Sequence, residues 1–517
     1  MKKILCITLM SLVAASCSQP QQVAMSCTGV DLPSQRLFLQ QLSDTSVIFK
    51  WRGEAERVCV GQDPDSLNLE VFAQEEDGHK IARIEGLKAD TVYHYSVGGA
   101  PEAAPGFMFR TAPRTGQLPQ DGNIRLWLLG DSGPATEVDR EGNPEYPGQA
   151  EAVRDGFMKY NEAVTDKHID AVLLLGDNAY PAGTDAEWQG AYFDIYGDII
   201  RSAVTLPTIG NHEMGVGMMN VCTFYPLPDC DKGEVVLPIG GASMNSDADS
   251  YDSDGSGNDQ GGLPYLSIFT LPTRGEMGGA PSGTEQYYSS DFGNVHIVSL
   301  DSQLSNADDD LRSAMREWLI ADLQSSQQDW TIVIFHHPTL SKGENHDSDL
   351  EQREIDMRVT FAPIFEEYGV DAVYSGHAHS YERSWYLRGH YGMSNTFDPK
   401  SHAALDATGS PAFGGEDRPY DQENRLVYTV AGSSGKVNTW SPCRPEQFMS
   451  NGQAFGCTMD NWLMHPAHRT FDIVADDYRV HGIARLGSVV IDATRDTLTS
   501  RFVDVGGVVL DTFVIRR

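Results

Sequence analysis

Short runs of alternating apolar and polar residues dominate the segment 34–113. Two clear examples cover residues 45–51 and 92–97, and turn-forming residues separate such runs from one another. Alternation with a period of two places one face of a strand on a core and the other face toward water. The pattern therefore predicts an all-β region over residues 34–113, built as a small sandwich.

From residue 122 onward, uninterrupted apolar runs alternate with amphipathic segments. Such runs are typical of the buried strands of a parallel sheet, and the amphipathic segments are typical of the helices that cover it. The expected strands are residues 125–129, 171–175, 331–335 and 371–374, and the expected helices are residues 147–160 and 309–323. Alternation typical of β-strands returns over residues 480–514. The chain is thus predicted to continue as an α/β domain over residues 122–517.

Two stretches interrupt this second pattern. Residues 214–290 are rich in Gly, Ser and Asp, and residues 384–425 are irregular. Insertions this long are usually lids or poorly ordered loops, so we expect the first to be an excursion from the domain. Its acidic run over residues 247–259 misses the EF-hand template, because Ser250 stands where the first Asp should be. An acidic loop without a bound ion is preferred here to a calcium loop.

The N-terminus has the pattern of an export signal. Lys2 and Lys3 precede an apolar run over residues 4–15 that is too short to span a bilayer comfortably. We expect a signal peptide over residues 1–17 and a linker over residues 18–33. The tetrad ending at Cys17 resembles a bacterial lipobox, in which Cys17 would carry a lipid, and ordinary cleavage without a lipid is the alternative. The expected location is the periplasm or the cell surface, with the outer membrane reached only through a lipid on Cys17.

Charge and cysteine content narrow the function further. With 38 Lys and Arg against 73 Asp and Glu, the net charge of −35 argues against nucleic acid and anionic lipid as partners. The oligomeric state stays open. Six cysteines follow the signal, an even number that favours disulfides in an exported protein. Local pairing is the simplest guess, although six cysteines permit about 15 connectivities. The guessed pairs are Cys222 with Cys230 and Cys443 with Cys457.

Five short motifs each follow or adjoin a predicted strand. In order they are GDSG at 130–133, GDNAY at 176–180, GNHE at 210–213, VIFHHP at 333–338 and GHAH at 376–379. Loops that leave the carboxyl ends of strands in an α/β sheet converge on one crevice, so these motifs are expected to meet. Singly each motif is weak, but together they offer carboxylate, amide, phenol and imidazole donors. That mixture suits Fe(III), Zn, Mn or Fe(II) and is poor for Cu(I) or iron–sulfur clusters.

The five motifs together resemble the metallophosphoesterases, and the version that contains Tyr180 resembles the purple acid phosphatases. Supporting segments are YYS at 287–289, LDS at 300–302 and GHAHSYER at 376–383. The segments IEGLKADTVYHYSV at 84–97 and FMFRTAP at 107–113 similarly resemble a fibronectin type III domain. The resemblance covers residues 34–517 and implies a fibronectin-like β-sandwich followed by a four-layer αββα domain. The insertion 214–290 departs from the family pattern, which leaves substrate specificity open.

Carried over residue by residue, the resemblance implies a binuclear metal centre with Asp177 as the bridging ligand. One set binds Fe(III) and the other binds a divalent Zn, Mn or Fe ion. The first set is Asp131, Tyr180 and His379, and the second is Asn211, His336 and His377. His336 is preferred to His337 as the ligand because of its register after the strand and before Pro338.

The resemblance also implies catalytic, substrate-binding and orienting residues around the metals. His212 is expected near the leaving group, and a structural histidine is the alternative. His346 is expected to bind phosphate together with Asn211 or to protonate the departing oxygen, and a solvated loop residue is the alternative. Glu213 and Glu382 are expected to orient their neighbours.

The implied activity is that of an acid phosphatase, which hydrolyses small phosphate monoesters through a metal-bound hydroxide and without a phospho-enzyme. A phosphodiesterase or nucleotidase that uses the same site is the first alternative. A non-catalytic surface binding protein is the second. The sequence contains no GxSxG elbow and no P-loop, so serine hydrolase and NTPase chemistry have no support.

Overall fold

The computed structural model describes residues 27–139, 141–164, 168–220, 236–241, 262–306, 309–342, 346–414, 425–437, 465–469, 471 and 482–517. The expected signal peptide with Cys17, the two guessed cysteine pairs and the acidic run 247–259 lie outside these ranges. Within these ranges, no helix combines the length and hydropathy needed to cross a bilayer.

The N-terminal region is all-β, as the alternating pattern predicts. Its strands are β1 (Gln35–Gln40), β2 (Ser46–Arg52), β3 (Arg57–Gly61), β4 (Leu69–Phe72), β5 (Gln74–Glu76), β6 (His79–Glu85), β7 (Val92–Val97) and β8 (Met108–Arg110). One sheet contains β4-β3-β7-β8, and β1-β2-β6-β5 lie in another. The ring of Phe49 packs 4.7 Å from that of Tyr95, between centroids. The hydroxyl of Tyr93 accepts a hydrogen bond of 3.0 Å from the Lys88 amide, which closes a strand corner. The fibronectin type III assignment stays a prediction.

The N-terminal strands are continuous with a larger sheet. Leu39 of β1 pairs in parallel with Val204 of β11 (Val204–Pro207). The order of this sheet is β22-β21-β20-β9-β10-β11-β1-β2-β6-β5. Its other strands are β9 (Ile124–Leu129), β10 (Ala171–Leu174), β20 (Gly487–Ala493), β21 (Thr497–Asp504) and β22 (Val509–Arg516). The N-terminal region is therefore joined to the rest of the chain by backbone hydrogen bonding as well as by sequence.

A second large sheet has the order β14-β15-β16-β17-β19-β18. Its strands are β14 (Tyr288–Phe292), β15 (Val295–Ser299), β16 (Trp330–Ile334), β17 (Ala372–Ser375), β18 (Tyr381–Arg383) and β19 (Val427–Ala431). Alternation along β16 shows how it is packed. Ile332 and Ile334 join the core that contains Leu126 and Leu173 of the first sheet, whereas Val333 joins a separate core with helical residues such as Phe365. The second sheet thus lies between the first sheet and a helical layer.

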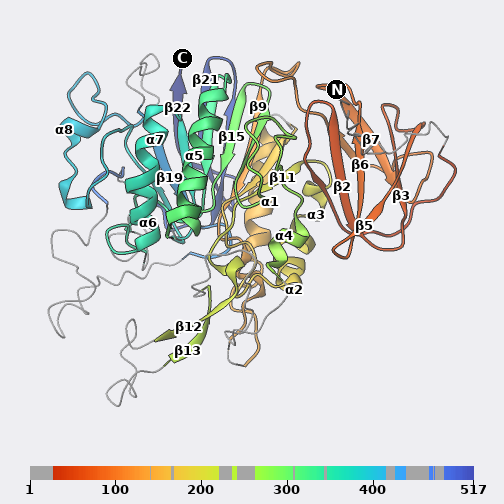
Figure 1. Cartoon of the computed structure of the whole chain (residues 1–517), viewed down its shortest axis with the longest axis horizontal. Coiled ribbons are helices and arrows are strands. Elements are labelled where there is room, and N and C mark those ends of the chain that lie inside the picture. The colour runs from red at the N-terminus through yellow and green to blue at the C-terminus, as the bar shows by residue number, and fades with distance from the viewer. Residues whose placement is uncertain are drawn as a thin grey trace, which may run out of the picture.

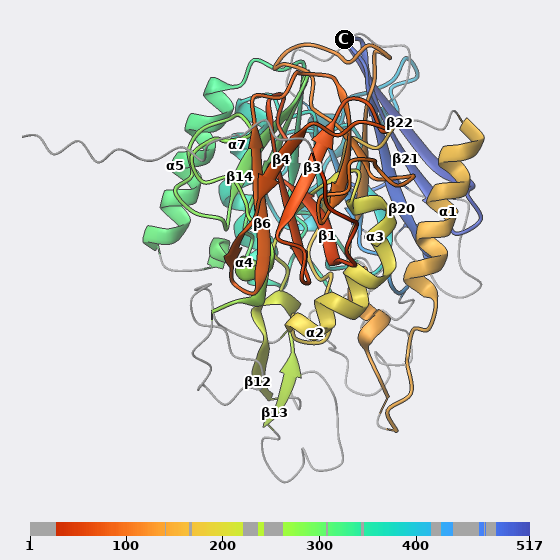
Figure 2. The ribbon, with the colours of Figure 1, turned by 90° about the vertical axis from the view of Figure 1, so that its right-hand side faces the viewer.

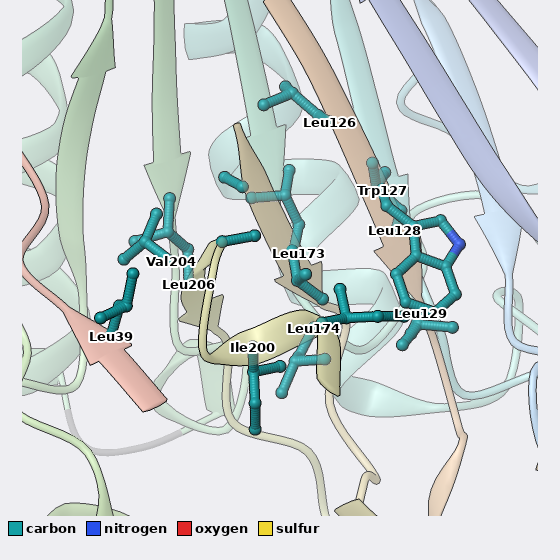
Figure 3. Close-up of a cluster of buried hydrophobic side chains, with 14 of the residues drawn as sticks. Leu39, Leu126, Trp127, Leu128, Leu129, Leu173, Leu174, Ile200, Val204 and Leu206 are labelled. Carbon is teal, nitrogen blue, oxygen red and sulfur yellow. The ribbon is translucent and has the colours of Figure 1, made fainter. Parts of the chain in front are cut away.

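Helices cover the outer faces of the two sheets (Figures 1 and 2). The helices are α1 (Gln149–Val164), α2 (Asp185–Trp188), α3 (Asp194–Ile200), α4 (Pro264–Ile268), α5 (Asp309–Ser325), α6 (Gln352–Asp356), α7 (Ala362–Glu367) and α8 (Pro399–His402). Helix α1 lies against β20 and β21, and α5 and α7 lie on the far side of the second sheet. The leucine-rich core of the first sheet is shown in Figure 3. The predicted strands and helices of this region are confirmed, with bounds shifted by a few residues.

The expectation that residues 214–290 form an excursion from the domain is partly wrong. Strands β12 (Val216–Asn220) and β13 (Val236–Gly240) form a hairpin that projects from the body of the protein (Figure 1). The segment beyond residue 262 is not a free excursion, because Tyr265 and Phe269 are buried in the main core. The ring of Phe269 lies 5.1 Å from that of Trp188 and 6.0 Å from that of Phe38. This part of the insertion fastens the N-terminal strands to helix α2.

Candidate metal centre

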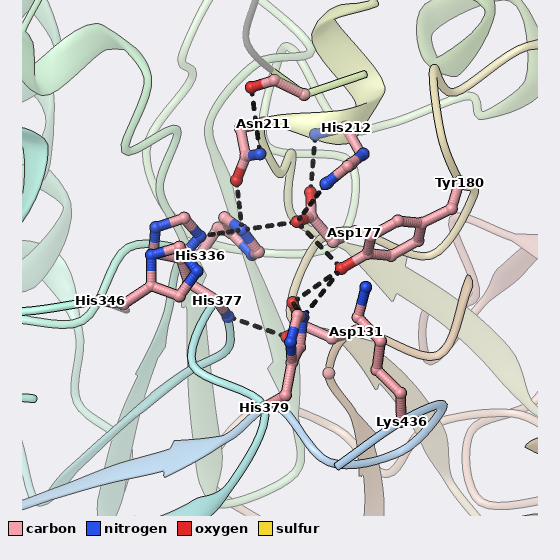
Figure 4. A network of polar contacts seen from close by, with 12 residues as sticks. Asp131, Asp177, Tyr180, Asn211, His212, His336, His346, His377, His379 and Lys436 are labelled. Carbon is pink, nitrogen blue, oxygen red and sulfur yellow. Dashed lines mark hydrogen bonds and ion pairs between the residues drawn. The ribbon is translucent and has the colours of Figure 1, made fainter. Parts of the chain in front are cut away.

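The seven side chains proposed as metal ligands come together at the carboxyl ends of the strands (Figure 4). Asp131 and Asp177 follow β9 and β10, and Asn211 follows β11. His336 follows β16 of the second sheet, and His377 and His379 follow β17. Because both sheets send these loops to the same edge, residues distant in sequence meet there. The full set is Asp131, Asp177, Tyr180, Asn211, His336, His377 and His379.

Three of these residues have left-handed backbone conformations. The φ angles are 53° at Asp131, 54° at Asp177 and 72° at His377. Non-glycine residues seldom adopt such angles, and strain of this kind clusters at functional sites. Local hydrogen bonds hold the conformation, since the amide of His377 donates to Asp131 Oδ2 at 2.8 Å. Neighbouring glycines allow the close approach: a Cβ on Gly376 would collide with the Asp131 carboxylate.

One half of the site surrounds the hydroxyl of Tyr180. The Tyr180 Oη lies 3.2 Å from Asp131 Oδ1, 3.3 Å from Asp177 Oδ2 and 3.2 Å from His379 Nε2. The side chain is fully buried. Burial, and then the charges of Asp177 and Asp131, hold the pKa of Tyr180 well above its usual value. The phenol is therefore protonated in the absence of a cation, and a cation among these oxygens would favour the tyrosinate.

The other half of the site surrounds Nε2 of His336. This atom lies 3.1 Å from Asp177 Oδ2, 2.9 Å from Asn211 Oδ1 and 3.2 Å from His377 Nδ1. On the opposite side of the ring, Nδ1 donates to the carbonyl of Leu175 at 2.9 Å. That bond turns Nε2 toward the centre, as is common in metal-binding histidines. Burial alone would lower the pKa of His336, but the Asp177 carboxylate raises it to about 9.

His337 lies beside the same cluster. One ligand atom from each of His336, His337 and His377 lies within 4.8 Å of the others. The Nδ1 of His337 is 2.8 Å from the hydroxyl of Ser302, and burial lowers the pKa of His337 well below its usual value. His336 makes the contacts with Asp177 and Asn211, so the geometry favours His336 as the ligand.

Asp177 is the residue that contacts both halves. It is 2% exposed, and one ligand atom from each of Asp131, Asp177 and His336 lies within 4.8 Å of the others. Desolvation would raise the pKa of Asp177, but His336 and His212 lower it below its usual range. An ionised carboxylate between two groups of donors has the position needed to bridge two cations.

Glu213 accepts hydrogen bonds from the two loops that carry Asp177 and Asn211. Its carboxylate accepts hydrogen bonds of 2.8 Å from the amides of Asp177, Asn178 and Gly210. Burial and the nearby Asp177 charge raise the pKa of Glu213 to about 8. A Cβ on Gly210 would collide with Asp177, so the two loops can approach only with glycine at this position. Glu213 orients its neighbours, in agreement with the sequence-based expectation.

Two histidines expected to assist lie next to the proposed ligands. The His212 amide donates to Asp177 Oδ1 at 2.7 Å, and its Nδ1 lies 2.7 Å from the Pro181 carbonyl. The His212 ring packs against that of Tyr180 with centroids 3.9 Å apart and the ring planes tilted by 32°. The ring of His346 lies 3.6 Å from that of His377. Both histidines therefore lie at the edge of the candidate metal centre.

Glu351 is a functional candidate that the sequence interpretation missed. Its two carboxylate oxygens contact different histidines, with Oε1 2.8 Å from His346 Nδ1 and Oε2 3.0 Å from His377 Nε2. A carboxylate that binds the outer nitrogen of a metal-binding histidine fixes the ring and its tautomer. Glu351 precedes the short helix α6 and belongs to no recognisable motif, so only its position in space reveals this contact.

Glu382 holds a neighbouring loop. It accepts hydrogen bonds from the hydroxyls of Ser341 at 3.0 Å and Ser380 at 3.1 Å, and it lies 3.0 Å from His468. The bond to Ser341 holds the loop that follows His336 and His337.

Replacing Glu351 with Gln tests whether it positions the two histidines. We expect about a 10–100-fold loss of metal affinity or of catalytic efficiency. The Glu carboxylate offers one acceptor oxygen to each histidine ring, whereas the Gln amide has a single acceptor oxygen. Metal affinity is measured by competition with a chelator, and catalytic efficiency by steady-state kinetics. Gln352→Ala, one residue further along on α6, is the matched control and should behave as the wild type. Full metal affinity and activity in Glu351→Gln would show that the contacts are incidental.

Comparisons with known proteins agree with this geometry. Residues 124–381 match the calcineurin-like phosphoesterase family. Purple acid phosphatase 22 of Arabidopsis thaliana is 25% identical over 71% of this chain and 67% of its own length. Phosphoenolpyruvate phosphatase of Allium cepa is 25% identical over 58% of this chain and 50% of its own length. The chain thus spans only about half the length of some of the curated relatives that it matches.

A solved structure shows the same fold. Purple acid phosphatase PPD1 from yellow lupin (Lupinus luteus) has a TM-score of 0.57 and 15% identity, and the match covers 94% of this chain and 74% of that one. The family match identifies residues 124–381 as a metallophosphoesterase domain. The chain is also similar to purple acid phosphatases, and the family match and these relatives together support a metal-dependent phosphoric ester hydrolase.

Proposed function

We propose that this protein hydrolyses phosphate monoesters of small molecules and acts as an acid phosphatase with a binuclear metal centre. The observation that carries the proposal is the arrangement of Tyr180 on one side of Asp177 and His336 on the other, within 3.3 Å of the same carboxylate oxygen. The curated relatives include proteins described as purple acid phosphatases.

The donor set fits two cations. Carboxylate, phenol and imidazole around Tyr180 suit Fe(III), whereas amide and two imidazoles around His336 suit a divalent Zn, Mn or Fe ion. We therefore propose Asp131, Tyr180 and His379 as one ligand set, Asn211, His336 and His377 as the other, and Asp177 as the bridge. Such a pair of cations would supply an activated nucleophile and would offset the charge of the reacting phosphate.

The protein's own residues then bind and orient the substrate. The Nδ2 of Asn211 donates to the carbonyl of Gly241 at 3.1 Å, which fixes the orientation of an amide that we propose also contacts phosphate. The carbonyl of Pro181 orients His212, and the carboxylate of Glu351 orients His346. We propose that His346 binds a phosphate oxygen and that one of the two histidines provides the proton for the leaving oxygen.

The purified protein should cleave p-nitrophenyl phosphate with at least about tenfold higher kcat/KM than bis(p-nitrophenyl) phosphate, a difference of about 1.4 kcal/mol in barrier. Rates are measured across acidic to neutral pH, together with metal content and the visible spectrum. Two metals per chain, with a visible band that Tyr180→Phe abolishes, would support Fe(III) bound to tyrosinate. A strong preference for the diester would replace the monoesterase proposal with a phosphodiesterase. Binding of substrate without turnover would indicate a non-catalytic binding protein.

We also propose that the protein is exported. The disulfide between Cys27 and Cys59 supports this, because disulfides persist in oxidising compartments. Fractionation of the native host tests the proposal, and a cytosolic protein would refute it. A lipid on Cys17 would be detected by mass spectrometry of the mature protein.

A further inference from the structure

The loop that follows β19 is fastened to the turn that carries Asp131. The amide of Ser434 donates to the carbonyl of Gly130 at 3.1 Å, and the Ser434 hydroxyl donates to the carbonyl of Gly487 at 3.0 Å. A Cβ on Gly435 would collide with the backbone carbonyl of Asp131. The loop is therefore held close to the proposed metal centre, and the residue after Gly435 has a defined position.

That residue is Lys436. Its ammonium nitrogen lies 4.5 Å from the ring centroid of Tyr180 and 3.2 Å from Oε2 of Glu137. Only 14% of the Lys436 side chain is exposed, and 20% of the Glu137 side chain. Figure 4 shows the lysine reaching from its loop toward Tyr180 and Asp131, with His212 on the other side of the tyrosine ring. A positive charge is thus fixed at the edge of the proposed centre.

This position matters because of the charge of the rest of the molecule. The chain has a net charge of −35, and a phosphate ester is itself an anion. Repulsion between the two must be overcome where the substrate binds. Glu137 follows the 3-10 helix Gly133–Thr136, which begins two residues after Asp131, and Lys436 lies on the loop bonded to Gly130. Both partners of the ion pair are therefore anchored to the same ligand-bearing loop. The pair is built into the site rather than formed by two mobile surface chains.

We propose that Lys436 recognises the phosphoryl group of the substrate, and that Glu137 holds Lys436 in place while offsetting part of its charge. This inference rests on the proposed phosphatase function, because it places an additional cationic contact at that same site. A hydrogen bond between charged groups contributes about 1.5–3 kcal/mol, which corresponds to about 10–150-fold in affinity. The competing explanation is that Lys436 only packs against the Tyr180 ring as a cation–π contact.

The test measures binding of inorganic phosphate to the metal-loaded protein by calorimetry, together with KM and kcat for p-nitrophenyl phosphate. Lys436→Met should weaken phosphate binding about tenfold or more and should raise KM more than it lowers kcat. Lys436→Arg should keep most of the affinity. Glu137→Gln should bind phosphate a few-fold more tightly, because it removes a negative charge beside the lysine. Lys400→Met, an exposed lysine on α8, is the matched control and should bind as the wild type does.

The outcomes separate this inference from the function on which it rests. Unchanged phosphate affinity and KM in folded Lys436→Met would overturn the role of Lys436, whatever the enzyme hydrolyses. In another outcome, the wild type binds phosphate but hydrolyses no ester, while Lys436→Met does not bind phosphate. That result would overturn the phosphatase proposal and would support the anion contact at Lys436. If Lys436→Met does not fold, Lys436→Gln and the opposite effect of Glu137→Gln decide the question. The difference between wild type and Lys436→Met should also shrink as salt screens the charge.

Discussion

Asp177→Asn should abolish ester hydrolysis while the protein stays folded. We expect kcat/KM to fall about a thousandfold or more, which corresponds to a barrier about 4 kcal/mol higher. The reason is that Asp177 Oδ2 contacts both Tyr180 and His336, and Asn would present an uncharged NH2 donor there when its oxygen accepts from the His212 amide. The fold should persist, because the amide oxygen can still accept from the His212 amide. Kinetics, metal analysis and thermal melting of the same preparation check these expectations.

A matched control separates loss of chemistry from loss of stability. Asp492 of β20 is also buried and binds Arg125 at 2.8 Å, but Arg125 is at the opposite end of β9 from Asp131. Asp492→Asn should lower the melting temperature, because it removes the partner of a buried arginine. Activity per folded molecule should remain. Unchanged turnover in Asp177→Asn would remove Asp177 from the mechanism.

The strands of the α/β region could be predicted because their apolar runs are local signals. All six residues of β9 are buried, so the run in the sequence reports the burial directly. The pairing of Leu39 with Val204 could not be predicted in this way, since it joins two segments that share no local pattern. The buried part of the insertion was missed for a related reason. Its Gly and Ser content suggests a loop, and only the packing of Tyr265 and Phe269 shows that this segment belongs to the core.

The residues of the candidate site also fall into two groups, those that a local sequence pattern predicts and those that it does not. Residues such as Asp131 and His377 could be predicted because each stands in a short motif at the end of an apolar strand. Glu351 and Lys436 could not, because neither stands in a recognisable motif and each is identified only by its contacts in space. Glu351 becomes a candidate only when His346 and His377 are seen on its two oxygens. Lys436 becomes one only when its ammonium is seen beside Tyr180.

Glu213→Ala should cause the largest loss of stability among changes near the centre. Three amide groups donate to the Glu213 carboxylate at 2.8 Å, and the residue is fully buried. Removing the carboxylate leaves these donors without partners in a space where water has little access. Each unsatisfied buried donor costs about 1–3 kcal/mol, so we expect the free energy of unfolding to fall by about 3 kcal/mol or more. Urea denaturation measures this change, and the loops that carry Asp177 and Asn211 should bind metal more weakly.

Two further variants show whether the effect comes from this particular position. Glu213→Gln keeps one acceptor oxygen, so its stability should lie between those of the wild type and Glu213→Ala. Glu276 also accepts two backbone amides, from Thr273 at 3.0 Å and Arg274 at 2.8 Å, but it lies in a turn that is partly exposed. Glu276→Ala should cost less than Glu213→Ala and should leave metal binding intact, because water can replace the lost acceptor there. Equal losses in the two alanine variants would mean that Glu213 has no special part in supporting the centre.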